Sequence, residues 1–117
     1  MVLFNNCRAY DHAAAYGSGA FYDLRSTGRH ATLVTDLQVG EQCIVATPSN
    51  DGQITFAWHS FLREAVHPWK DGTLCRVFFG TQIKLDTCSR AEAVRDGSYS
   101  AFFDKNGNFK RQSVLHL

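Results

Sequence analysis

Residues 76–117 read RVFFGTQIKLDTCSRAEAVRDGSYSAFFDKNGNFKRQSVLHL, and this stretch decides the fold because strand, helix and hairpin patterns follow one another in it directly. Arg76–Phe79 is rich in β-favouring residues, and Ile83–Leu85 resumes the alternation of apolar and polar residues after a break at Gly80. The sequence therefore predicts strand on both sides of that glycine.

A short helix is predicted next, because Ser89 and Glu92 have the spacing of a capping box. In that motif the Ser89 hydroxyl accepts the amide hydrogen of Glu92, and the Glu92 carboxylate accepts the amide hydrogen of Ser89. Gly97 is expected to end the helix, since glycine is the commonest residue just past a helix C-terminus.

A hairpin and a last strand are predicted after the helix. Asn106-Gly107 is the strongest short hairpin signal, because both central positions of a type I′ turn need positive φ. The closing strand is expected over Phe109–Leu117, to the end of the sequence. In it the residues of one face are Phe109, Arg111, Ser113, Leu115 and Leu117, and those of the other are Lys110, Gln112, Val114 and His116.

The same rules applied to the first 75 residues predict further strands. In the longest of them, Ile54, Phe56 and Trp58 share one face. The expected elements are strands at Val2–Asn5, Ala20–Leu24, Gln42–Thr47, Gln53–Leu62 and Thr73–Phe79, a helix at Arg8–Tyr16, a turn at Ser49–Gly52 and a loop at Glu64–Asp71.

Five or six strands and two or three short helices in 117 residues predict an α+β fold built on a small curved mixed β-barrel. A flat sheet of this size would leave an apolar face and two edges exposed, whereas a closed one hides them.

The length leaves room for one domain, residues 1–117, with a single core. The formal net charge is +1, so bulk charge does not attract nucleic acid, and any such contact is expected to be local. No apolar run approaches the roughly 20 residues that span a bilayer, and the first residues lack the pattern of a signal peptide. We therefore expect a cytoplasmic domain without membrane contact, and the apolar end of the sequence suggests a module excised from a longer protein.

The sequence contains none of the common catalytic or metal-binding motifs. Cys7, Cys43, Cys75 and Cys88 are too far apart for paired zinc knuckles and are expected to be structural thiols. We expect neither a metal nor a cofactor, and no catalysis by this domain. A thiol-dependent enzyme remains the alternative, with Cys7 or Cys88 as nucleophile and one of the five histidines as base, and an assembly domain that dimerises near Leu117 is a third reading.

The residues best suited to recognition are aromatic, amide and basic side chains. Trp69 follows Pro68 in the expected loop and offers a stacking surface, whereas Trp58 fits either the core or a pocket. The candidate pocket residues for a base are Asn5, Asn6, Tyr22, Trp58 and Trp69, and the candidate phosphate contacts are Arg8, Arg29, Lys105, Lys110 and Arg111. An asparagine pair that caps a turn and a solvated hairpin rim are the structural alternatives.

Several short motifs resemble PUA-like domains, the superfamily that includes the ASCH, EVE and YTH branches. Residues 36–46, DLQVGEQCIVA, resemble the glycine, charged residue and apolar strand found in that superfamily. Residues 3–11, LFNNCRAYD, are similar to the first strand and loop of EVE-type modules, and Arg76–Gly80 with Phe109–Leu117 looks like the barrel-closing half.

The resemblance implies a reader module that recognises a modified base in DNA, favoured over RNA, by base flipping. Its expected partners are nucleic acid and a fused effector domain such as a nuclease, as in a modification-dependent restriction enzyme. The pair of tryptophans of a methyl-reading cage is not clearly placed, because Trp58 is expected to face the core, so the modification stays open.

Overall fold

The computed structural model describes residues 1–5, 21–26, 37–49, 51–69, 72–110 and 114–116. The strands in this part of the chain are β1 (Val2–Asn5), β2 (Phe21–Ser26), β3 (Gln42–Pro48), β4 (Gln53–Trp69), β5 (Gly72–Phe79), β6 (Lys84–Ser89) and β7 (Val114–His116), and the helices are α2 (Arg90–Arg95) and the 3-10 helix η2 (Ser100–Phe102). The helix expected at Arg8–Tyr16 lies outside the described residues.

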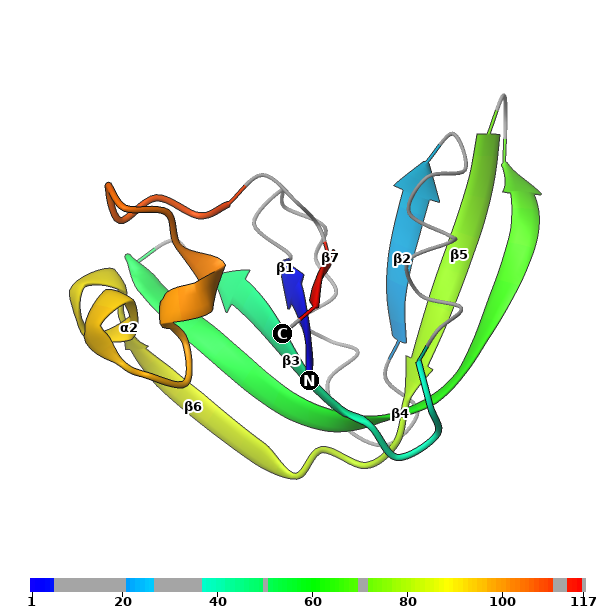
Figure 1. Ribbon diagram of the computed structural model, residues 1–117, viewed down its shortest axis with the longest axis horizontal. Helices are drawn as coiled ribbons and strands as arrows, with labels where there is room; N and C mark the ends of the chain where they lie inside the picture. The colour runs from blue at the N-terminus through cyan, green and yellow to red at the C-terminus, as the bar shows by residue number, and fades with distance from the viewer. Residues whose placement is uncertain (6–20, 27–36, 50, 70–71, 111–113, 117) are drawn as a thin grey trace.

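The strands form one mixed sheet in the order β2-β5-β4-β3-β1-β7, and β6 also pairs with β4. β1 runs parallel to β3, while the other pairs are antiparallel. The sheet is strongly curved (Figure 1), so the expectation of a small curved mixed sheet is confirmed. Among the described strands, none joins β2 to β7, so the expected closure of the barrel is not made by these elements.

The curvature comes from β4, which is 17 residues long and belongs to two parts of the sheet. Its first half pairs with β3 and β6, and its second half pairs with β5. We call β7, β1, β3, β6 and the first half of β4 the first wall, and β2, β5 and the second half of β4 the second wall. Figure 1 shows the second wall rising at the right, away from the first.

The loop expected at Glu64–Asp71 is wrong, because β4 continues through Trp69. Pairing with β5 holds this segment extended, from Phe61 opposite Phe79 to Trp69 opposite Gly72. Pro68 misled the prediction, but a proline is tolerated in an edge strand, and β4 is the outer strand of the second wall among the described residues.

The two walls meet where the register shifts between Phe61 and Arg63 and where β5 passes into β6. The Gly80 amide donates to the Ser60 carbonyl at 2.9 Å, and a Cβ at Gly80 would lie 2.6 Å from the Ser60 hydroxyl oxygen. This clash is with the free end of the Ser60 side chain, since the Ser60 carbonyl oxygen would lie 3.7 Å from the added atom, so rotation of the hydroxyl would relieve it. The predicted strand break at Gly80 is confirmed.

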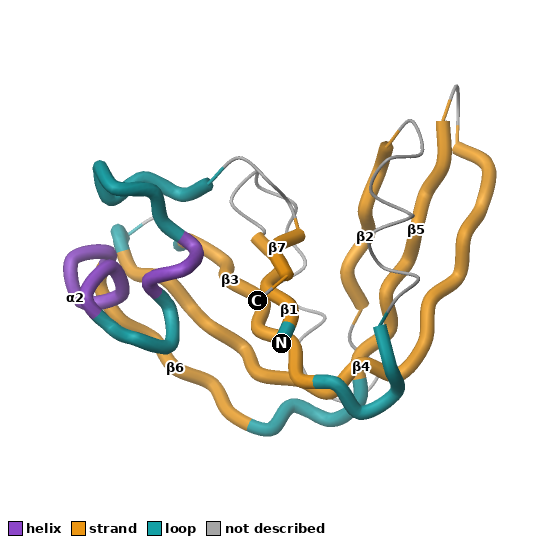
Figure 2. The backbone as a smooth tube through the Cα atoms, viewed as in Figure 1, coloured by secondary structure: helices purple, strands orange, loops and turns teal. Residues whose placement is uncertain are grey.

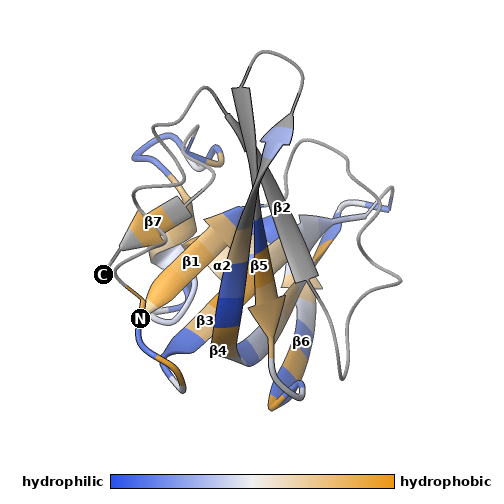
Figure 3. Cartoon of the chain, turned by 90° about the vertical axis from the view of Figure 1, so that its right-hand side faces the viewer, coloured by the Kyte–Doolittle hydropathy of each residue, from blue (hydrophilic) through white to orange (hydrophobic). Residues whose placement is uncertain are grey.

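Two hydrophobic clusters cover opposite faces of the first wall, because alternate residues of β1 and β3 point to opposite sides. The Phe79 cluster contains residues of both walls and therefore fills the angle between them; it consists of Val2, Phe4, Leu37, Cys43, Val45, Phe61, Val77 and Phe79. The Phe102 cluster connects the first wall to α2 and η2; it consists of Leu3, Ile44, Ala46, Ile54, Phe56, Ala93, Tyr99, Phe102 and Phe103. In Figure 3 most of β1 is coloured hydrophobic, and its apolar residues belong in turn to the two clusters.

The helix begins as predicted. The Glu92 amide donates to the Ser89 hydroxyl at 3.2 Å, and the Ser89 amide donates to the Glu92 carboxylate at 3.2 Å, which completes the capping box. The helix ends where predicted, with Asp96 as the C-cap and Gly97 directly after it. Gly97 does not have positive φ, however, and the extended conformation of Asp96 turns the chain out of the helix. α2 and η2 lie together at one side of the molecule (Figure 2).

The predicted hairpin at Asn106-Gly107 forms, but its loop is longer than a type I′ turn. The Asp104 amide donates to the Asn108 carbonyl at 2.8 Å, the Gly107 amide donates to the Asp104 carbonyl at 3.0 Å, and Gly107 has φ of 79°. This is the three-residue loop in which a type I turn precedes a glycine bulge. The Asp104 carboxylate stabilises it by accepting from the Asn106 and Asn108 amides.

The predicted last strand is present in part, as β7, which pairs along β1 from Val2 opposite His116 to Phe4 opposite Val114. Phe109, where the strand was expected to begin, makes only an isolated bridge with Phe103. No helix within the described residues is both long and apolar enough to cross a membrane.

Candidate functional site

Trp58 lies at the rim of the Phe102 cluster, on the face it shares with Ile54 and Phe56, as the alternation predicts. It stands between Ile44 of β3 and Lys84 of β6 in the sheet. Its side chain is neither fully buried nor fully exposed. Trp58 is therefore packed against the core and also partly accessible from outside.

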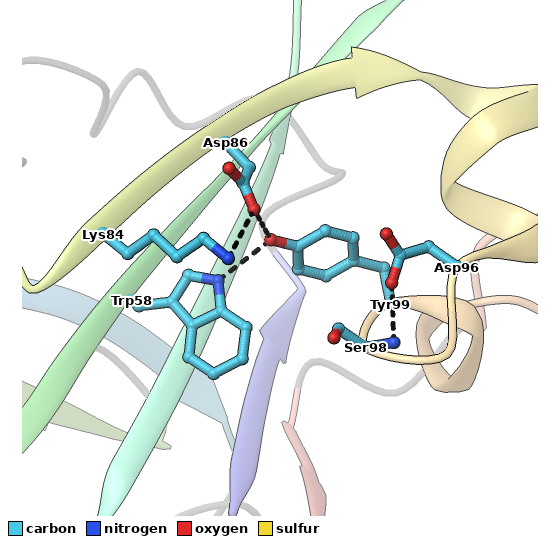
Figure 4. A network of polar contacts seen from close by, with 6 residues as sticks. All are labelled: Trp58, Lys84, Asp86, Asp96, Ser98 and Tyr99. Atoms are coloured by element: carbon cyan, nitrogen blue, oxygen red, sulfur yellow. Dashed lines mark hydrogen bonds and ion pairs between the residues drawn. The ribbon is translucent and has the colours of Figure 1, made fainter.

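A polar network fixes the indole ring (Figure 4). The Trp58 Nε1–H donates to the Tyr99 Oη at 3.0 Å, and the Tyr99 hydroxyl donates to Asp86 Oδ2. Lys84 Nζ lies 3.3 Å from Asp86 Oδ2 and 5.4 Å from the centroid of the Trp58 ring. The indole and the carboxylate thus share one tyrosine hydroxyl, and the lysine contacts both the indole ring and the carboxylate. We call these four residues the Trp58 site.

Tyr99 is positioned by the turn after α2 and by the core. Its amide donates to the Asp96 carbonyl at 3.0 Å, and its ring stacks on Phe56 with centroids 3.9 Å apart and planes 9° apart. The same turn is closed by the Ser98 amide, which donates to the Asp96 carboxylate at 2.8 Å (Figure 4). The turn and the stacking on Phe56 therefore hold the tyrosine hydroxyl against the strands.

The protonation states in the Trp58 site are set by its contacts. Burial, followed by the hydrogen bond to Asp86, raises the pKa of Tyr99 to about 12, so the phenol stays neutral and donates. The hydrogen bond from Tyr99, followed by contact with Lys84, lowers the pKa of Asp86. At neutral pH Asp86 is therefore a carboxylate and Tyr99 a neutral phenol.

The structure brings together two of the predicted recognition residues in a structural contact. Asn5 ends β1, is 4% exposed, and donates from Nδ2 to the Lys110 carbonyl at 2.8 Å. The Lys110 amide donates to the Phe102 carbonyl at 2.9 Å. Asn5 therefore connects the end of β1 to the segment that follows the hairpin loop. Lys105 is exposed in the loop between Asp104 and Asn108.

For two of the other predicted site residues the structure gives the position in a strand, and the remaining four lie outside the described residues. Tyr22 lies in β2 opposite Val77 and Trp69 ends β4 opposite Gly72, so both belong to the second wall, whereas Trp58 belongs to the first. Asn6, Arg8, Arg29 and Arg111 lie outside the described residues.

Cys43 and Cys88, the cysteines whose side chains the structure describes, do not have the features of an activated nucleophile. Burial raises the pKa of Cys43 to about 12, and Cys43 is fully buried. Burial and the carboxylates of Glu92, Asp96 and Asp86 raise the pKa of Cys88, whereas a reactive thiol needs a lowered one. Cys7 lies outside the described residues. No group of three or more His, Cys, Asp or Glu side chains within the described ranges could hold a metal ion.

Sequence reasoning missed Lys84, Asp86 and Tyr99 as neighbours of Trp58. Lys84 is its cross-strand partner, and this pairing depends on the register of β4 against β6, which composition does not reveal. The sequence offers one indication of these neighbours: the spacing of Lys84 and Asp86 places two opposite charges on one face of a strand.

Replacing Tyr99 by phenylalanine is expected to lower the free energy of unfolding at neutral pH by about 1–2 kcal/mol, because Trp58 and Asp86 lose their shared partner while the stacking on Phe56 is kept. Asp86 has a lowered folded pKa, so its contribution is present above the unfolded value of about 3.9 and is lost as the pH falls through the folded value. Urea denaturation from neutral to acidic pH should show the difference between the wild type and Tyr99→Phe shrinking with falling pH. A difference that stays constant would contradict the role given to Asp86.

Compared with family models, curated proteins and solved structures, the chain gives no match in any of the three searches.

Proposed function

We propose that this chain is a nucleic-acid-binding module that holds one base against Trp58. The observation that carries the proposal is the partly accessible indole of Trp58, oriented through its N–H by Tyr99 and accompanied by the Lys84 ammonium. Aromatic rings beside cations are the usual platform for an unpaired base and its phosphate.

Stacking requires a ring whose orientation is already set, because a free side chain loses rotational entropy on binding. The hydrogen bond of Trp58 to Tyr99 and the stacking of Tyr99 on Phe56 supply this orientation. Binding of a base would therefore not require the tryptophan side chain to lose further rotational entropy.

Positively charged side chains near Trp58 also support the proposed binding of a nucleic acid. Lys84 is 57% exposed, so its ammonium can exchange its contact with Asp86 for a phosphate. A second aromatic–cation pair borders the Phe102 cluster: the Arg90 guanidinium lies 5.5 Å from the centroid of the Phe109 ring. These contacts are local, which agrees with a net charge of only +1.

The resemblance of residues 36–46 to PUA-like readers extends the proposal. On that basis the bound base is a modified one, flipped out of duplex DNA, and the module delivers specificity to a fused effector such as a nuclease. The described residues support base stacking, and the modification and the effector belong to the proposal alone.

Fluorescence anisotropy tests the proposal with labelled single-stranded DNA, single-stranded RNA, plain duplex, and duplexes that carry methylated or hydroxymethylated bases. Trp58→Ala is expected to weaken binding of the preferred ligand by about 5- to 150-fold, because stacking contributes about 1–3 kcal/mol per base. Trp58→Phe, which keeps an aromatic face, should retain most of the affinity.

Lys84→Ala should weaken binding to every ligand and lower the slope of log affinity against log salt by about 1, as expected for one lost phosphate contact. Arg63→Ala, at an exposed cation of the second wall, is the control and should leave binding unchanged. Equally weak binding of every ligand, unchanged by Trp58→Ala, would refute the proposal.

A further inference from the structure

β6 is an edge strand with an apolar outer region. Among the described strands, β4 is its one neighbour, so its other edge carries backbone groups that no described strand pairs with. Leu85 is 51% exposed and the adjoining Ile83 is 61% exposed, although both are large and apolar. Exposed apolar edges are places where another strand adds to a sheet.

The sequence of β6 is complementary to itself when it is paired antiparallel about Leu85. In that register Leu85 lies opposite Leu85 of a second copy, and each Lys84 lies opposite the second copy's Asp86. Ile83 then lies opposite Thr87. Directly opposite residues share a face, so the two ion pairs form on the Trp58 face and the leucine pair on the other face.

We propose that β6 pairs with β6 of a second copy of this chain, across a two-fold axis through Leu85. Lysine in an edge strand normally discourages pairing. In this dimer Lys84 lies opposite Asp86 of the second copy. Its charge therefore disfavours pairing with other strands but favours pairing with a second β6. Lys84 is 57% exposed and Asp86 37% exposed, so both side chains are accessible to such a contact.

The proposed dimer has a consequence for the Trp58 site. A two-fold axis perpendicular to the sheet keeps the equivalent faces of the two copies on the same side of the joined sheet. The two Trp58 residues, each on the strand next to β6, would therefore lie on one continuous surface. This assembly uses a different edge from the dimerisation near Leu117 that the sequence suggested, because that end of the chain belongs to β7, which pairs with β1 and ends the order of strands in the sheet.

Sedimentation equilibrium of the purified chain, from micromolar to millimolar concentration, tests the proposal. The wild type should approach twice the mass of one chain. Leu85→Lys and Leu85→Glu each place like charges opposite each other and remove an apolar contact, so each should raise the dimer dissociation constant at least about tenfold. An equimolar mixture of the two variants should regain the dimer, because lysine then faces glutamate.

Leu85 is half exposed, so both variants are expected to keep the thermal transition of the wild type. Val39→Lys, at a 76% exposed residue outside β6, is the control and should leave the dimer unchanged. A wild type that stays monomeric at millimolar concentration, or a Leu85→Lys variant that still dimerises, would overturn the proposal. A mixture that stays monomeric would overturn the register.

Discussion

Phe56→Ala is expected to lower the free energy of unfolding by about 3–5 kcal/mol, as large-to-small changes of buried phenylalanines do. Phe56 is 0% exposed and lies in the centre of the Phe102 cluster. Its ring stacks on Tyr99 at 3.9 Å between centroids and lies 5.5 Å from Phe102. Alanine would leave a cavity between the sheet and the segment after α2. For a domain with a stability of about 5–15 kcal/mol, this loss is a large fraction of the total.

Urea denaturation followed by circular dichroism measures the change. Val39→Ala, at a 76% exposed side chain, should shift the free energy by less than about 0.5 kcal/mol and serves as the control. Phe56→Leu, which refills part of the volume, should fall between the two. A loss below about 1 kcal/mol for Phe56→Ala would show that the Phe102 cluster does not stabilise the fold in the way its burial indicates.

Local elements were predictable because their stabilising contacts join residues that are close in sequence. The capping box of Ser89 and Glu92 is one example. The turn after β3 is another: the Ser49 amide donates to the Gln53 carbonyl at 2.9 Å, and Gly52 has φ of 82°. In both cases the residue types and their spacing determine the hydrogen bonds directly.

The second half of β4 could not be predicted, since its extended conformation depends on β5. Beyond Leu62, where the predicted strand ends, the segment through Trp69 contains Pro68 and lacks a clean alternation, both of which indicate a loop when the segment is considered alone. The tertiary pairing decides the conformation here, as it often does for strands. The bend at Gly80 was visible as a break, but its direction depends on packing between the walls.

The candidate site was predicted in part, because alternation places one residue of it correctly. Trp58 shares a face with Phe56, and this followed from the period of a strand. Its partners Lys84 and Tyr99 come from segments 26 and 41 residues further along the sequence, taken as the differences between residue numbers. Such contacts depend on register and on the turn after α2, and no local pattern encodes them.

Deletion of residues 114–117 is expected to remove the cooperative thermal transition of this domain. β7 pairs with β1 over three residues, and Leu115 packs against the Phe102 cluster. Without β7, one edge of β1 would lose its interstrand hydrogen bonds. This matters because β1 is a buried strand, in which Val2, Leu3 and Phe4 are 0% exposed. Unpaired buried backbone groups and newly exposed apolar side chains together should cost roughly 5 kcal/mol or more.

Differential scanning calorimetry of the truncated and complete chains measures this effect. A loss of that size approaches the total stability of a typical domain, so the truncated chain should show no cooperative transition. Leu115→Met keeps the volume and the strand and should cost less than about 1.5 kcal/mol, which separates loss of the strand from loss of one side chain. A truncated chain that keeps its transition would show that β1 is held by β3 alone. The sheet would then end at a parallel edge pair, and β7 would contribute nothing to the core it borders.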